Sequence, residues 1–424
     1  MKEYYFISDL HIWGDYMLQN CEFEEELIIF LKSLETKDKN TELIMVWDIF
    51  GLREVITVDG ADKLKKIIDD NNKIFEQFKA TGEKIDITVI PWNHDYELVL
   101  YPEMEKILKT YNIKLEKKVY ITRPIGNKKI RIEHWNQFDK YWYIKDFGRN
   151  NYFPPWYFIS RNLVMEMGQV AMDKKQKWLW DLKYTDVDRT FSRAISNYFY
   201  RELNPLIRYF VVPFLLLFSF SFIVLIWLLL QKFGIIKTNY LSDLWHFFGI
   251  FGNILDLVIW VDIFFIVILA IFFIPYKLLL KDFKKFLKRY GFSNSFFKGD
   301  ELFKYKDNIF DIFYKHPKVS IFIFGHTHRP LLEKIWGKVI INTWTWLKSF
   351  IKVRSWPRFL FSVYYPYYNL WYFHIYQEGK QAIIKYHKIH KKIKYKFTIL
   401  ESIAILGKKP KIKNKIPTTN KINL

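Results

Sequence analysis

The stretch "YYFISDLH", residues 4–11, sets the pattern of the chain: an aromatic, apolar run that ends in an aspartate and a histidine. Later stretches share this form, a short apolar run followed by a carboxylate or an imidazole: "ELIMVWD" (42–48), "IDITVIPWNHD" (85–95) and "KKIRIEH" (128–134). Segments with helical periodicity lie between them, near residues 22–35, 61–80 and 96–110. This alternation predicts a layered α/β domain whose functional residues follow the carboxyl ends of strands.

The composition predicts an anionic partner. Its 65 Lys and Arg against 44 Asp and Glu give a net charge of +21, which suits either nucleic acid or a membrane surface with acidic lipids. The basic residues concentrate at 277–292 and from Lys380 onward, near strongly apolar sequence. Cys21 is the single cysteine and the N-terminus has no signal-peptide pattern, so we expect a reducing, cytoplasmic setting.

Two apolar segments predict a membrane hairpin over residues 209–276. Residues 209–231 carry no charge and are long enough to cross a hydrocarbon core of about 30 Å, although a buried core helix is the alternative. Residues 250–276 are nearly as apolar but contain Asp256 and Asp262, so this segment either spans with its acids accommodated or only dips into the bilayer. Lysine and arginine are much denser after residue 276 than in the connecting loop, which predicts that both flanks face the cytoplasm.

The strand pattern resumes after the hairpin, in "VSIFIFGHTHRP" (319–330) and "KVIINTWTWL" (338–347). The α/β domain is therefore predicted to be interrupted by an insertion. The expected plan has five parts: 1–208, first part of the α/β domain; 209–276, the hairpin; 277–317, a basic helical segment; 318–400, second part of the domain; and 401–424, a basic, disordered tail.

Five polar clusters follow the predicted strands, in the order "DLH", "WD", "WNHD", "EH" and "GHTH". Each alone is explained by a turn, a cap or a structural histidine. Together they contain what two divalent metal ions about 3.5–4 Å apart require: carboxylates, several imidazoles and a neutral oxygen donor. The ordered set therefore predicts a dinuclear metal site.

These blocks resemble the pattern D-x-H, G-D, G-N-H-D/E, H, G-H-x-H of the calcineurin-like metallophosphoesterase superfamily, over about residues 1–140 and 318–347. The resemblance implies a layered β-sandwich flanked by helices, here interrupted by the membrane hairpin. It also implies hydrolysis of a phosphate ester or anhydride by a hydroxide that is activated by two divalent ions. Manganese is favoured for these ions, with iron and zinc as alternatives.

Residue roles are also carried over from the resemblance. One metal ion is expected at Asp9, His11 and His328, the other at Asn93, His134 and His326, with Asp48 bridging the two. His94 is expected to contact the phosphate and to protonate the leaving oxygen, with Asp95 orienting its ring.

The sequence departs from the family at glycine positions, which are occupied by Trp47, Trp92, Trp135 and Trp344. The chain has 16 glycines and 16 tryptophans, whereas the usual glycine share would give roughly 30. One hypothesis is that UGA codons for glycine have been read as tryptophan. The alternative is that these tryptophans are genuine and that the site is remodelled or inactive.

The leading functional hypothesis is a membrane-anchored phosphohydrolase facing the cytoplasm, with a phosphorylated substrate that is lipid-linked. The turn "EHWNQFD" and the stretch "GHTHRP" resemble the branch that contains UDP-2,3-diacylglucosamine diphosphatases. A nucleotide or nucleic-acid phosphodiesterase is a second hypothesis, with nucleic acid the less favoured partner of the basic charge. A catalytically inactive membrane scaffold is the third.

Overall fold

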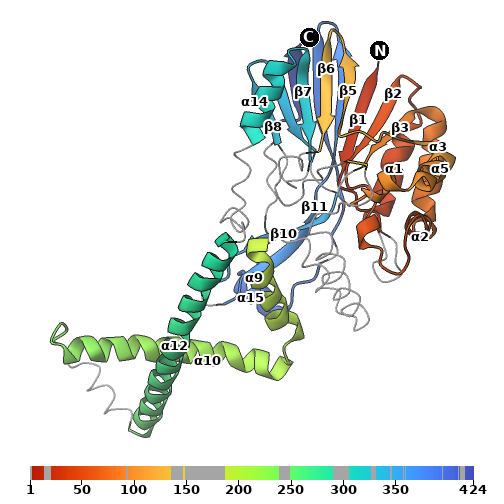
Figure 1. Cartoon of the computed structure of the whole chain (residues 1–424). Helices are drawn as coiled ribbons and strands as arrows, with labels where there is room; N and C mark the ends of the chain where they lie inside the picture. Colours follow the sequence, from red (N-terminus) through yellow and green to blue (C-terminus); the bar gives the residue numbers. More distant parts are fainter. Residues whose placement is uncertain are drawn as a thin grey trace. The chain divides into compact units, whose positions relative to one another are not determined.

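The computed structural model divides the chain into two compact units (Figure 1). The sheet unit comprises Met1–Ala194 and Glu301–Leu424, and the helical unit comprises Ile195–Asp300. The residues that the structure describes are 2–13, 21–91, 94–134, 147–148, 187–237, 249–289, 305–325, 331–343, 346–356, 358, 360–393, 395–408, 410 and 416–424.

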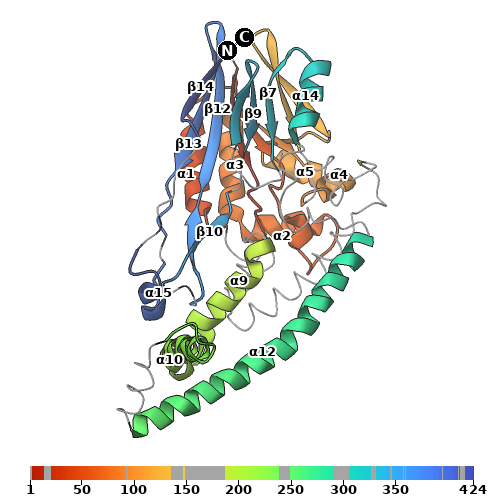
Figure 2. The same ribbon diagram turned by 90° about the vertical axis from the view of Figure 1, so that its left-hand side faces the viewer.

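The first sheet of the sheet unit has seven strands in the order β14-β13-β12-β1-β2-β3-β4. Figure 2 shows its β12, β13 and β14. The strands β1 to β4 are parallel to one another, and β12 to β14 add an antiparallel edge next to β1. Their bounds are Glu3–Ser8 (β1), Thr41–Val46 (β2), Asp86–Ile90 (β3), Ile113–Leu115 (β4), Leu370–Glu378 (β12), Gln381–Ile389 (β13) and Thr419–Asn423 (β14).

The second sheet has five strands in the order β5-β6-β7-β9-β8, in which β6, β7 and β9 are parallel. A separate two-stranded ribbon pairs β10 with β11. The bounds are Tyr120–Ile125 (β5), Lys128–Glu133 (β6), Val319–Phe324 (β7), Leu331–Ile335 (β8), Lys338–Asn342 (β9), Lys348–Val353 (β10) and Val363–Tyr368 (β11).

The two sheets pack face to face, because successive side chains of each strand point to opposite faces of its sheet. On β1, Tyr4 and Phe6 enter one core with residues of the second sheet such as Ile321 and Ile323, while Tyr5 and Ile7 face the opposite side. Successive strand side chains point to opposite faces, so a run that is apolar at every position buries both faces of its sheet. The predicted α/β layering is confirmed.

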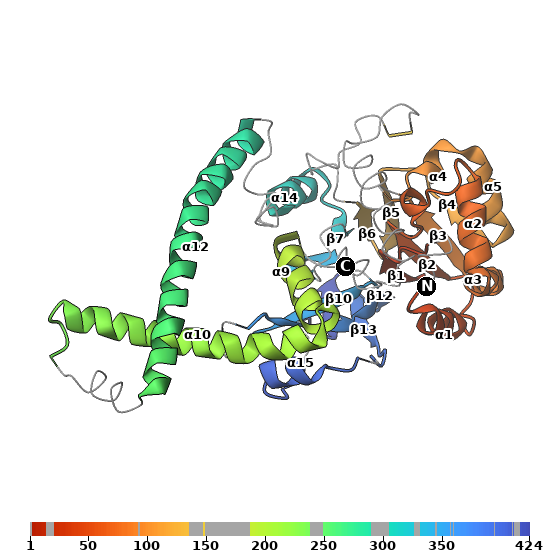
Figure 3. The same ribbon diagram turned by 90° about the horizontal axis from the view of Figure 1, so that it is seen from below.

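Helices cover the outer face of the first sheet, as Figures 1 and 3 both show for α1, α3 and α5. A single helix was predicted near residues 61–80 and another near 96–110, but each region holds two, and in the second Pro102 starts the later helix. α14 covers the outer face of the second sheet (Figure 2), where Phe313 packs edge-on against Phe322 of β7 and Ile309 and Ile312 join the same core cluster. The helix bounds are Glu24–Leu34 (α1), Asp62–Asp70 (α2), Asn72–Lys84 (α3), Glu97–Leu100 (α4), Pro102–Thr110 (α5), Val187–Asn197 (α9), Tyr305–Lys315 (α14) and Ile399–Ala404 (α15).

The C-terminal tail corrects one expectation. Residues 401–424 were predicted to be disordered. However, α15 begins with a capping box between Thr398 and Glu401, and β14 pairs with β13. Ile422 is 1% exposed and joins the core between the sheets. One well-placed apolar residue and a free sheet edge are enough to order a stretch whose composition is that of a disordered tail.

The helical unit contains α10 (Pro205–Lys232) and α12 (Ile250–Arg289), which contact each other. Two helices were predicted in this region, although α12 continues past residue 276, where the hairpin was expected to end. Within the described residues, no helix combines the length and the apolarity that a membrane span needs. The membrane-spanning part of the prediction is therefore not supported.

Candidate active site

Six of the predicted site residues lie within the described chain, and all six follow the carboxyl ends of parallel strands. Asp9 and His11 follow β1, Asp48 follows β2, His94 and Asp95 follow β3, and His134 follows β6. The predicted ligands Asn93, His326 and His328 lie outside the described residues, as do Trp92, Trp135 and Trp344. Their roles stay predictions.

Backbone hydrogen bonds hold the loops after β1, β2 and β3 side by side. The amide of Asp9 donates to the carbonyl of Trp47 at 3.1 Å, and the amide of His11 donates to that of Asp48 at 2.9 Å. The amide of Trp47 in turn donates to the carbonyl of Ile90 at 3.1 Å. The backbone hydrogen bonds between β1, β2 and β3 thus continue past the ends of these strands. They bring Asp9, His11 and Asp48 together at the carboxyl edge of the first sheet.

The backbone of these loops is strained. Asp9, His11, Trp47 and Asp48 have φ values of 49°, 45°, 61° and 47°, in the left-handed region. Such conformations are costly for residues with a Cβ, and clusters of them are typical of functional sites. Aspartate tolerates this region better than most residues, whereas tryptophan does not.

The donor atoms of His11, Asp48 and His94 all lie within 4.8 Å of one another. His134 joins this group, because its Nε2 is 3.9 Å from Oδ2 of Asp48, nearly the same as the 4.0 Å from His94 Nε2 to that oxygen. Asp48 therefore stands between two imidazoles, one from each sheet, as a bridging ligand would.

The surroundings of Asp48 disfavour its ionised carboxylate unless a positive charge is nearby. Burial raises the pKa of its carboxyl, and neighbouring Asp9 raises it further, against the lowering effect of His94. Asp9 and Asp48 are only 1% and 2% exposed. A cation would offset the repulsion between two buried carboxylates, and carboxylate with imidazole is a donor set that manganese, iron and zinc accept. The residues present therefore fit a divalent metal.

The His94 ring has a carboxylate partner that the sequence did not predict. Nδ1 of His94 lies 2.6 Å from Oε1 of Glu54, a buried residue of the short helix η1 (Leu52–Glu54), and Arg53 Nη2 lies 2.8 Å from Nε2. The same Arg53 Nη2 lies 2.9 Å from Nδ1, so the guanidinium contacts both ring nitrogens. No motif marks Glu54, because its role depends on how η1 folds back onto the loop after β3.

Asp95 makes a different contact. Its Oδ2 accepts from the backbone amide of Ile49 at 2.9 Å, and the backbone amide of His94 donates to Oδ1 of Asp48 at 3.1 Å. Both bonds tie the loop after β3 to the loop after β2. The predicted role of Asp95 in orienting the His94 ring stays a prediction, while Glu54 makes the observed ring contact.

No protein-family model matches the chain, and no curated protein matches it. Similar solved structures include a predicted phosphoesterase from Streptococcus pneumoniae, with 8% identity and a TM-score of 0.28, covering 91% of this chain and 89% of that one. A single mutant of Vps29 from Entamoeba histolytica has 10% identity and a TM-score of 0.27 over 91% and 92% of the two chains. Vacuolar Protein Sorting 29 from Cryptosporidium parvum has 10% identity and a TM-score of 0.28 over 92% of each. TM-scores this low support no conclusion, so the fold and site rest on their own geometry.

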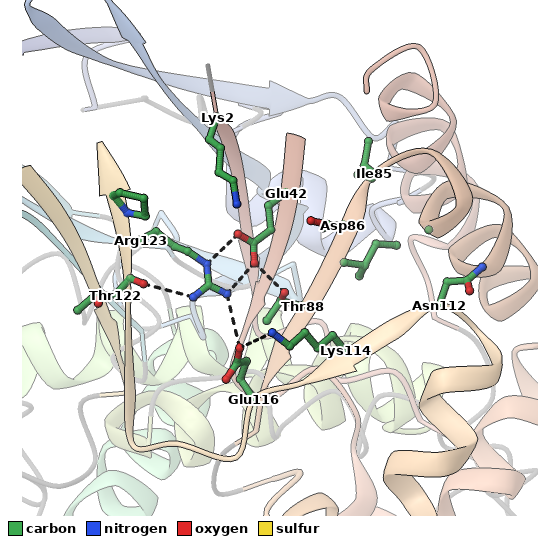
Figure 4. Close-up of a pocket in the computed structure, with 13 residues that line it drawn as sticks. Lys2, Glu42, Ile85, Asp86, Thr88, Asn112, Lys114, Glu116, Thr122 and Arg123 are labelled. Carbon is green, nitrogen blue, oxygen red and sulfur yellow. Dashed lines mark hydrogen bonds and ion pairs between the residues drawn. The ribbon is translucent and has the colours of Figure 1, made fainter. Parts of the chain in front are cut away.

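A second cavity, of about 510 Å³, opens near the amino ends of β2 and β3, away from the metal-ligand cluster (Figure 4). Its charged side chains neutralise one another. Nε and Nη2 of Arg123 each lie 2.7 Å from a different oxygen of Glu42, and Lys114 pairs with Glu116 at 2.8 Å. Because Arg123 is on β5 and Glu42 on β2, this network joins the two sheets, and we assign it a structural role.

Proposed function

We propose that the protein is a metal-dependent phosphohydrolase that cleaves a phosphate ester or pyrophosphate. One observation carries this proposal: Asp48 lies 3.9 Å and 4.0 Å from imidazole nitrogens of His134 and His94, with Asp9 and His11 in the same buried cluster. A carboxylate between two imidazoles, with a second buried carboxylate beside it at the carboxyl edge of parallel strands, suits two divalent ions. Membership of the calcineurin-like metallophosphoesterases is part of this proposal, on the strength of the ordered motifs.

The chain's own residues would divide the work as follows. Asp48 would bridge the two ions, Asp9 and His11 would hold one, and His134 the other. The ions would supply Lewis-acid stabilisation and a nucleophile at neutral pH. His94, partly exposed at the rim of the cluster, would contact the phosphate and give a proton to the leaving oxygen, and Glu54 would fix its ring.

Metal dependence tests the proposal directly. Protein stripped of metal and then given manganese should hydrolyse p-nitrophenyl phosphate, bis(p-nitrophenyl) phosphate or a nucleoside diphosphate ester, and a chelator should abolish this. The ester preferred would separate monoesterase, diesterase and pyrophosphatase chemistry. Protein that holds no stoichiometric Mn, Fe or Zn and cleaves none of these would support the scaffold hypothesis.

Glu54→Gln should lower kcat by about 10- to 100-fold while changing KM little, because a neutral amide holds the His94 ring less firmly than the carboxylate does. The measurement is kcat and KM at one pH near neutrality. Glu83→Gln, an exposed change on α3, is the matched control and should leave both constants unchanged. An unchanged kcat in Glu54→Gln would mean that Glu54 has only a structural role.

The same variant should change stability in acid. Burial alone would raise the pKa of Glu54, but the charges of His94 and Arg53 outweigh it and hold the pKa well below the ordinary 4.5. A carboxyl whose folded pKa is depressed stabilises the fold above its unfolded value and loses this contribution as the pH falls. Below pH 4.5 the unmodified protein should therefore lose thermal stability more steeply than Glu54→Gln.

The partners stay predictions. A lipid-linked substrate, contact with anionic lipid and a location at the cytoplasmic face are not tested by the structure. Their remaining support is the net charge of +21 and large apolar side chains that are exposed on α10 and α12, among them Phe210, Ile223, Trp260 and Phe264.

A further inference from the structure

Two tryptophans have backbone conformations that belong to glycine. Trp47 has a φ of 61° and Trp336 a φ of 49°. Left-handed φ values bring the Cβ of an L-residue against the backbone, and for a bulky side chain they are outliers, whereas glycine adopts them freely.

Two other loops can be compared with the one that holds Trp336. Three pairs of strands, β5/β6, β12/β13 and β8/β9, are joined by two-residue loops: Gly126–Asn127, Gly379–Lys380 and Trp336–Gly337. The first loop residue has a φ of 55°, 58° and 49°, respectively. Only in the third loop is the second residue also in the left-handed region, with a φ of 74° at Gly337, so that loop is a different type of turn. Its first position favours glycine, asparagine or aspartate, yet it holds a tryptophan that is 76% exposed.

Trp47 is also fully buried, and its indole N–H has no hydrogen-bond partner within the described part of the chain. Trp227 and the buried Trp371 share this lack, so it does not by itself set Trp47 apart. What sets Trp47 apart is a positive φ at a fully buried aromatic residue. Trp346, in contrast, is 1% exposed without a positive φ, donates to the carbonyl of Trp371 at 2.7 Å and packs against Phe23 and Phe30.

A positive φ alone does not identify a glycine position, because Leu406 also has one, of 53°. Leu406 is 56% exposed, in a loop that does not have to enclose its side chain. Trp336 differs because it fills a turn position that glycine, asparagine or aspartate normally occupies, and Trp47 differs because its left-handed backbone is fully buried in the core.

Trp47 also occupies space beside the metal-ligand cluster. Its ring lies edge-on to His134, with centroids 5.4 Å apart. A Cβ placed on Gly325 would be 2.8 Å from the Trp47 ring and 3.5 Å from Oδ2 of Asp9, so ring, glycine and carboxylate bound one small space. The indole therefore fills the space beside a predicted ligand and Gly325, which leaves the ligands little room to move around a bound cation.

We propose that residues 47 and 336 are glycine in the protein as its own cells make it, and that the Trp47 indole weakens the binding of a divalent cation at the Asp9–Asp48–His134 cluster. Their codons would be read as glycine in those cells and as tryptophan in the sequence. Trp346 is a genuine tryptophan. The cation part of this proposal rests on the proposed function, whereas the glycine part does not.

Peptide mass spectrometry of the protein from its own cells tests the first part. Peptides that contain positions 47 and 336 should have the mass of glycine, and the peptide with position 346 should have that of tryptophan. Tryptophan at position 47 or 336 would overturn the inference, whatever the protein's activity. Glycine at all three positions would contradict the structural distinction that we draw for Trp346.

Manganese titration of metal-free recombinant protein tests the second part. Trp47→Gly should bind manganese about 10- to 100-fold more tightly than the tryptophan form, as expected for a residue that acts on the ligands from outside. Trp336→Gly should leave the affinity unchanged and raise the melting temperature. Equal affinity in Trp47→Gly and in the tryptophan form would overturn the cation part.

The two failures can be told apart. Tight manganese binding by Trp47→Gly without hydrolysis of any phosphate ester would refute the proposed function and leave this inference standing. Hydrolysis by the tryptophan form, with manganese affinity equal to that of Trp47→Gly, would do the reverse.

Discussion

Asp48→Asn should abolish manganese-dependent hydrolysis and, in the same step, stabilise the metal-free protein. Loss of a bridging carboxylate should cost more than about 100-fold in activity, since even partners outside the coordination sphere cost 10- to 100-fold. The stabilisation follows from the raised pKa of Asp48, which is due to its burial and to Asp9. Asparagine can still accept from the backbone amide of His94, so the loop contact is retained.

The pH dependence gives the sign of the effect. A carboxyl whose folded pKa is raised is harder to ionise in the fold than in the unfolded chain, so its ionisation destabilises the protein. This cost is complete above the raised pKa and disappears in acid, where the carboxyl is neutral in both states. The melting temperature of metal-free Asp48→Asn should therefore exceed that of the unmodified protein near neutral pH, and the difference should shrink as the pH falls.

The control for this variant is Asp62→Asn, which alters an exposed pair with Lys65 and should change stability by less than about 0.5 kcal/mol. Hydrolysis by Asp48→Asn at an undiminished rate would show that the cluster is not the reaction centre. A destabilised metal-free Asp48→Asn would show instead that the carboxylate is compensated within the fold.

Lys63→Met should destabilise the protein by about 3–5 kcal/mol, the cost of leaving a buried partner charge without its counter-ion. Lys63 is fully buried, and its Nζ lies 2.7 Å from Oε1 of Glu97, which is itself 4% exposed. The bond joins α2 to α4, the helix that directly follows His94 and Asp95. We therefore expect weaker metal binding as well as a lower free energy of unfolding, measured by urea denaturation.

Position 65 offers a matched control on the same helix. Lys65 pairs with Asp62 at 2.8 Å, but their side chains are 60% and 65% exposed, so Lys65→Met should cost less than about 1 kcal/mol. The double variant Lys63→Met/Glu97→Leu removes the buried charge and should recover much of the lost stability. If Lys63→Met costs no more than Lys65→Met, the buried pair contributes little to the fold.

Several elements could be predicted from single stretches. β1, β2, β3, β7 and β9 lie where apolar runs predicted them, because a strand that is buried on both faces must be apolar at every position. Asp9, His11 and Asp48, which follow β1 and β2, lie together because parallel strands finish at the same edge of the sheet. Other elements had no such signal: β14 depends on a free sheet edge and on Ile422, and the fold placed α12 across a boundary that apolarity alone had set at residue 276.

Alternation and run length predicted the strands β1, β2, β3, β6, β7 and β9 and the polar side chains that follow them, since both signals act within a few residues. These signals placed Asp9, His11, Asp48, His94 and His134 in one candidate site. The folded chain was needed to show that Glu54 contacts the His94 ring, that Arg123 joins the two sheets, and that Trp47 has a left-handed conformation beside His134. Those features depend on contacts between residues that are distant along the chain or on the φ of one residue. Neither produces a periodic pattern in the sequence.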